Sequence, residues 1–130
     1  MAVVALITWL ITAAGGFVML AGWIARGGHR PGGGSRLGAP MVFTHFALAA
    51  AGLVLWIIYL AADADGLAWA AFVLLLPVAL LGFVMFARWL GTRGATAPES
   101  RFPLAVVLGH GLFAATTLVL VLLTALGIGA

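Results

Sequence analysis

The chain has 130 residues, of which 65% are hydrophobic and only 7% are charged. Soluble domains carry about 25% charged residues, so this composition excludes a water-soluble globular protein and predicts a domain solvated by a lipid bilayer. The net charge of +3 comes from six arginines and three acidic residues. Because the arginines are spread through short loops, they predict membrane topology and no nucleic-acid partner. The absence of cysteine excludes disulfides, thiolate metal sites and iron–sulfur clusters.

Four apolar runs follow one another along the chain, over residues 2–24, 41–62, 67–90 and 103–128. Each is roughly 20 residues or longer, which is enough to cross a hydrocarbon core about 30 Å thick as an α-helix. Backbone groups in lipid must be hydrogen-bonded within their own segment, so the runs predict helices. The fold class is therefore an all-α membrane protein with a four-transmembrane-helix bundle, and Pro77 is expected to bend the third helix.

Basic residues mark two of the three connectors, and the arginines of the chain are Arg26, Arg30, Arg36, Arg88, Arg93 and Arg101. They lie in or beside the first and third connectors, whereas the short middle connector carries only Asp63 and Asp65. Positive loops stay in the cytoplasm. This distribution predicts a multi-pass protein of the bacterial cytoplasmic membrane with both termini outside.

The sequence contains an internal repeat. Residues 16–23 read GFVMLAGW and residues 82–89 read GFVMFARW, with six of eight positions identical at an offset of 66. HFALAAAGLVL from His45 likewise matches HGLFAATTLVL from His110 at an offset of 65. The chain is expected to consist of two tandem helical hairpins, residues 1–65 and 66–130, related by a pseudo-two-fold axis along the membrane normal.

The repeat brings two histidines to matched positions in the second and fourth runs. Ionisable residues inside a membrane are costly, face the bundle interior and mark function. His45 and His110, at similar depth near the cytoplasmic end, therefore suit a b-type haem with one axial imidazole from each side. Gly16 and Gly82 lie near this layer and leave room for a porphyrin, and Arg88 could pair with a propionate.

Two other interpretations use the same layer. The histidines could simply hydrogen-bond neighbouring helices and hold the bundle together. Met19 and Met85 form a second repeated pair, and thioether sulfur with imidazole could bind copper as Cu(I) or complete a His/Met haem site. Methionine also commonly fills gaps in a helical core.

Four helices with a histidine pair on the second and fourth resemble the cytochrome b561-like family of membrane cytochromes. That family places two haems between two histidine pairs, and this chain has one pair, so the resemblance implies at most one haem. It implies electron transfer in the membrane, with quinone or a redox partner protein. The alternatives are a non-catalytic accessory or anchor subunit of a larger membrane complex, or a copper-binding or transport protein, and a homodimer is left open.

Overall fold

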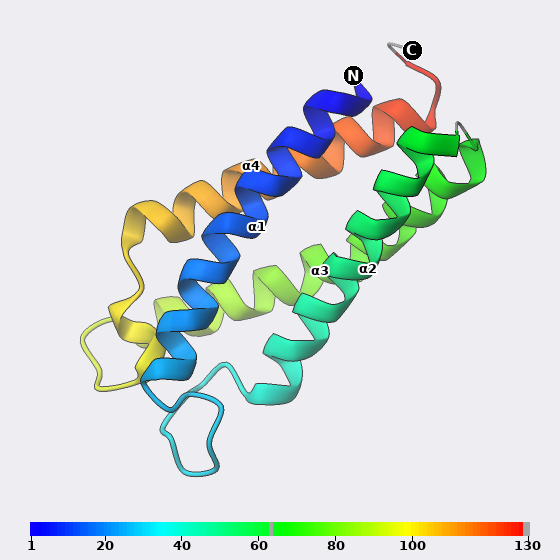
Figure 1. Ribbon diagram of the computed structural model, residues 1–130. Coiled ribbons are helices and arrows are strands. Elements are labelled where there is room, and N and C mark those ends of the chain that lie inside the picture. Colours follow the sequence, from blue (N-terminus) through cyan, green and yellow to red (C-terminus); the bar gives the residue numbers. More distant parts are fainter. Residues whose placement is uncertain (63, 129–130) are drawn as a thin grey trace.

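The computed structural model describes residues 1–62 and 64–128, and within these ranges it contains helices and no strands (Figure 1). The four long helices are α1 (Ala2–Ala25), α2 (Ala39–Ala62), α3 (Asp65–Leu90) and α4 (Leu104–Ala125). A short 3-10 helix, η1 (Pro98–Arg101), precedes α4. The predicted all-α class with four helices is confirmed. Asp63, which was predicted to mark the middle connector, lies outside the described residues.

Each long helix is apolar enough to cross a membrane. The helices have 22 to 26 residues, with a mean hydropathy of 2.1 to 2.6 over their most apolar windows. Large apolar side chains also face outward, as at Phe83 and Leu112, which are 72% and 67% exposed. A water-soluble bundle would not present so many large apolar side chains to water. The protein is therefore a multi-pass membrane protein.

Proline occupies positions that helices tolerate. Pro103 immediately precedes α4 and Pro98 opens η1, where a missing N–H costs no helical hydrogen bond. Pro77 lies inside α3, and the helix continues through it to Leu90. In a membrane bundle, neighbouring helices compensate for the hydrogen bond that an internal proline removes.

The tightest helix pairs join the two halves of the chain. α1 packs along α4 and α2 packs along α3, while α3 and α4 pack less extensively and α1 and α2 least. The start of α1, the end of α2, the start of α3 and the end of α4 lie at one end of the bundle, and the first and third connectors lie at the other (Figure 1). We call these the terminal end and the connector end.

The packed core occupies the terminal end. Trp56 is fully buried among Ala5, Ala71 and Val121, which are also fully buried. Its indole N–H donates to the backbone oxygen of Ala2 at 3.2 Å. Because these side chains fill the terminal end, the open space between the two helix pairs lies in the connector half of the bundle, which contains the candidate site.

Hydrogen bonds link the two long connectors to each other and to α3 at the connector end. The backbone N–H of Arg36 donates to Oε1 of Glu99 at 2.7 Å, and the Arg36 guanidinium donates to the Gly91 oxygen at 3.2 Å. The Arg88 guanidinium donates to the Arg36 oxygen at 3.1 Å. Because these bonds link the first connector to α3 and the third connector, they hold the α1–α4 and α2–α3 pairs together at this end.

Candidate functional site

A cavity of about 600 Å³ lies between the helix pairs in the connector half of the bundle. All four long helices line it, and the lining is overwhelmingly apolar. Its volume lies within the range of about 300–1,000 Å³ that is typical of small-molecule and cofactor sites. Both membrane histidines line this cavity, as do Met19 and Met85.

The two imidazole rings lie close together. The centres of the His45 and His110 rings are 6.4 Å apart, with an angle of 50° between their planes. A metal ion held between two imidazoles, at about 2 Å from each nitrogen, places the ring centres roughly 6 Å apart. The spacing therefore suits a single metal centre between the two rings.

Backbone carbonyls of neighbouring helices orient both rings. Nδ1 of His45 lies 3.0 Å from the oxygen of Val78 on α3, and Nδ1 of His110 lies 2.8 Å from the oxygen of Thr12 on α1. A carbonyl oxygen can only accept, so Nδ1 carries a proton, and in the neutral imidazole Nε2 then keeps its lone pair. This is how metal-ligating histidines are usually oriented, with the second nitrogen bonded to a carbonyl or carboxylate.

The second nitrogen of each ring is available. In the described part of the chain, the hydrogen bonds of His45 and His110 use Nδ1 alone. Neither Nε2 is among the buried, unpartnered polar atoms there, which are His29 Nδ1, Trp89 Nε1 and Glu99 Oε2. Each Nε2 therefore reaches open space, and the cavity is the space that both rings line.

Glycine makes the close approach of each imidazole possible. A Cβ atom on Gly16 would lie 3.2 Å from Cε1 of His110, and one on Gly82 would lie 3.5 Å from Cε1 of His45. Each glycine lies four residues, about one helical turn, after the residue whose carbonyl accepts from the ring that it contacts. Each imidazole therefore packs against a turn of helix that carries no side chain at the glycine. Gly16 and Gly82 also line the cavity, and the room that we predicted for a porphyrin beside them stays a prediction.

The remaining predicted residues divide into two groups. Met19 and Met85 line the same cavity as the histidines. Arg88 is not among the lining residues, because its guanidinium is exposed at the connector end and donates to Arg36. Among the described residues, no group of three or more histidine, aspartate or glutamate side chains could hold a metal ion.

Two buried residues of this region were not predicted as site residues. The Trp89 ring lines the cavity and its Nε1 is buried without a partner, whereas the repeat-related Trp23 donates to Ser35 Oγ at 2.9 Å. Glu99 is fully buried, with Oε1 bonded to Arg36 and Oε2 unpartnered. Trp89 could have been identified because it ends the repeated segment, and Glu99 because it is the single acid among the arginines of the connectors.

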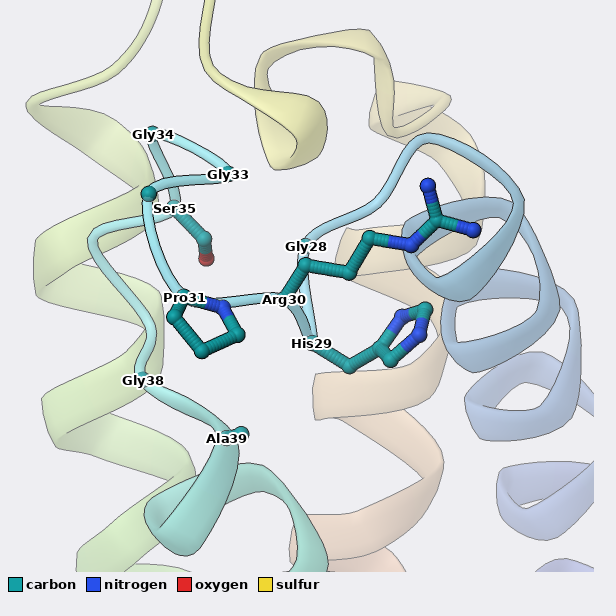
Figure 2. Close-up of a pocket in the computed structure, with 10 residues that line it drawn as sticks. Gly28, His29, Arg30, Pro31, Gly33, Gly34, Ser35, Gly38 and Ala39 are labelled. Carbon is teal, nitrogen blue, oxygen red and sulfur yellow. The ribbon is translucent and has the colours of Figure 1, made fainter.

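The glycine-rich first connector forms a second, smaller hollow of about 250 Å³. Figure 2 shows the side chains of His29 and Arg30 extending to the same side of the loop. The His29 ring lies 6.4 Å from the Trp23 ring, and its Nδ1 is buried. His29 is half-buried, because its ring packs against the indole of Trp23.

No protein-family model, curated protein or solved structure matches this chain. The resemblance to cytochrome b561-like proteins therefore stays a prediction that rests on the helix count and the histidine pair.

Proposed function

We propose that this chain is a single-haem b-type cytochrome that transfers electrons within the membrane. The observation that carries the proposal is the pair of imidazoles, 6.4 Å apart, each with Nδ1 fixed by a helix carbonyl and Nε2 free. The cavity that His45 and His110 line supports the proposal, because its walls are apolar and its volume of about 600 Å³ lies in the range of cofactor sites.

Bound haem supplies a one-electron iron couple, and the protein tunes it through its axial ligands and burial. The chain contributes the two imidazoles, the carbonyls that hold them in one tautomer, and the apolar walls of the cavity. Electrons would be exchanged with a lipid-soluble quinone or with a redox partner protein at the membrane-facing helices.

The pattern of hydrogen bonds supports the internal duplication. At an offset of 66, Thr12 corresponds to Val78 and Gly16 to Gly82, and at 65 His45 corresponds to His110. The bond from His45 to Val78 is therefore the repeat equivalent of the bond from His110 to Thr12. We propose a pseudo-two-fold axis along the membrane normal, which a superposition of residues 1–65 on 66–130 would test.

Charge supports an orientation in the membrane. All six arginines lie in the first or third connector or in the last turn of α3, at the connector end, whereas the start of α1 and the end of α4 lie at the terminal end. Under the positive-inside rule the connectors are cytoplasmic and the termini outside, in a bacterial cytoplasmic membrane.

Two alternatives have support from the same cavity. The Nδ1 bonds of His45 and His110 join neighbouring helices, which is what an accessory or anchor subunit in a larger complex or homodimer would need for stability. Met19 and Met85 line the same cavity, which favours copper as an alternative cofactor.

The deciding experiment is the visible spectrum of the protein purified from haem-sufficient cells, together with its metal content. We expect a Soret band and sharp reduced α and β bands. His45→Ala and His110→Ala should each lose or strongly alter the low-spin spectrum, while His29→Ala should leave it unchanged. A colourless protein would contradict the cytochrome proposal; copper in it would favour the copper site, and no metal the accessory subunit.

His110→Asn separates ligation from helix packing. An amide can still donate a hydrogen bond toward the Thr12 carbonyl, but it does not replace imidazole as a haem ligand. We expect His110→Asn to lose the low-spin spectrum as completely as His110→Ala while unfolding at a higher temperature than it. If the spectrum survives in both variants, His110 is not an axial ligand.

A further inference from the structure

An indole donor without an acceptor is buried in the wall of the cavity, at its connector end. Trp89 is 4% exposed and lines the cavity, and its Nε1 is buried with no hydrogen-bond partner. Trp23, the repeat equivalent of Trp89, also lines the cavity, but its Nε1 donates to Ser35 Oγ. An indole N–H can only donate, and buried donors normally have a partner. The unsatisfied indole therefore calls for an acceptor that the described residues do not provide.

The charge around this indole indicates which acceptor fits. The guanidinium carbon of Arg93 lies 5.8 Å from the centre of the Trp89 ring. All of the arginines lie at this end of the bundle, and the one acid among them, Glu99, already accepts from Arg36. A guanidinium beside an unpaired donor stabilises an anionic acceptor there more than a neutral one.

We infer that the ligand of the cavity presents a carboxylate to the connector end and that Trp89 Nε1 donates a hydrogen bond to it. The inference rests on the proposed function, because haem b carries two propionate carboxylates on one edge. It orients the porphyrin, with its propionate edge toward the connectors and its opposite edge toward the Trp56 core. Since Nε1 is covered by neighbouring atoms, the carboxylate displaces some of that cover when it binds. This assigns to Trp89 the role that was predicted for Arg88.

Two porphyrins that differ only in this charge provide the test. The full chain, purified in detergent from cells in which haem synthesis is blocked, is titrated with haem b and with its dimethyl ester, whose acid groups are esterified. We expect Trp89→Phe, which keeps an aromatic ring and removes the N–H, to weaken haem b binding about 10- to 100-fold. Its affinity for the ester should stay close to that of the wild type.

Trp23→Phe is the matched control. It removes the same N–H from the repeat-related position, where Ser35 already accepts it. Any effect of Trp23→Phe on binding should therefore be equal for haem b and for the ester. The midpoint potential gives a second readout, because removing a donor from a propionate changes the field at the iron, and only Trp89→Phe should shift it.

The outcomes separate this inference from the proposed function. If the wild type binds neither porphyrin, the cytochrome proposal fails and this inference fails with it. If the wild type binds both as low-spin complexes and Trp89→Phe weakens both equally or neither, only the inference is overturned. If Trp89→Phe does not fold, the wild type still decides the matter, because equal affinities for haem b and its ester would overturn the carboxylate contact.

Discussion

Replacing Gly16 with alanine tests how tightly the helix backbone holds the imidazole of His110. The added methyl group would lie 3.2 Å from Cε1 of His110, so the ring must shift by a few tenths of an ångström. The ring cannot retreat freely, because its Nδ1 is bonded to the Thr12 oxygen at 2.8 Å. Overpacking of this kind costs about 1–3 kcal/mol in a well-packed core.

We expect Gly16→Ala to lower the free energy of unfolding by about 1–3 kcal/mol and to lower haem content, because the displaced ring leaves the position that suits a metal centre. Gly82→Ala should be milder, because its methyl group would meet Cε1 of His45 at 3.5 Å, an ordinary van der Waals distance. Gly109→Ala is the control. Gly109 is also next to His110 in the sequence but does not line the cavity, and an added methyl group there meets nothing within 4 Å.

The assay is the haem content per protein, with the intensity of the low-spin bands and the thermal unfolding temperature of each variant. We expect the effect to be largest in Gly16→Ala, smaller in Gly82→Ala and absent in Gly109→Ala. Equal effects at Gly16 and Gly109, or a larger effect at Gly82 than at Gly16, would show that the contact with the imidazole is not what matters.

Three further predictions concern topology and stability. A cysteine at Thr96 should react with impermeant reagents only from the cytoplasmic side and one at Asp65 only from outside, in a chain that has no cysteine of its own; reversed labelling would mean that the arginine bias assigned the sides wrongly. Thr117→Val removes the hydroxyl bonded to Thr8 at 2.9 Å between α4 and α1. We expect about 0.5–1.5 kcal/mol lower stability on unfolding in detergent, with no change in the haem spectrum; loss of haem would contradict this separation. Glu99→Ala removes the acceptor of a backbone N–H in the first connector. We expect it to lower the free energy of unfolding by about 1.5–3 kcal/mol and to speed proteolysis of the connectors, with Glu99→Gln closer to the wild type. Equal losses in the two variants would show that the acceptor is not what matters.

The helices could be predicted from the sequence because lipid leaves the backbone few alternatives. The predicted runs agree with the observed helices within a few residues, and the fourth helix begins at Leu104, just after the predicted Pro103. The pairing of α1 with α4 and of α2 with α3 could not be predicted. In lipid the outward and inward faces of a helix are both apolar, so no hydrophobic stripe identifies the neighbour. The 3-10 helix and the hydrogen bonds between the connectors depend on contacts over more than 50 residues of sequence, such as Arg36 with Glu99.

The candidate site could be predicted in part. The repeat indicated that His45 and His110 would face a common interior, and the two rings line one cavity. The acceptors of their Nδ1 atoms were not predictable, because they are backbone carbonyls, which every residue carries. Arg88 was a reasonable partner for a propionate on charge alone, but its side chain bonds the first connector instead. Sequence position gave the depth of Arg88 and not the direction of its side chain.

A purely structural role for His45 and His110 does not explain why each ring has an Nε2 atom without a partner. A hydrogen bond between the hydroxyls of Thr8 and Thr117 already joins α1 to α4. Threonine makes this bond without adding a ring nitrogen that has no partner. Each imidazole makes one such bond through Nδ1, but it also brings a lone pair on Nε2 into an apolar cavity, where an unpaired polar group costs free energy. That cost arises twice within 6.4 Å, at His45 and at His110. A metal centre between the rings would use both lone pairs, and the same Nδ1 bonds that join the helices would then also fix the tautomer that it needs. Helix packing and ligation are therefore not competing uses of these histidines, and the free Nε2 atoms are what favour the metal.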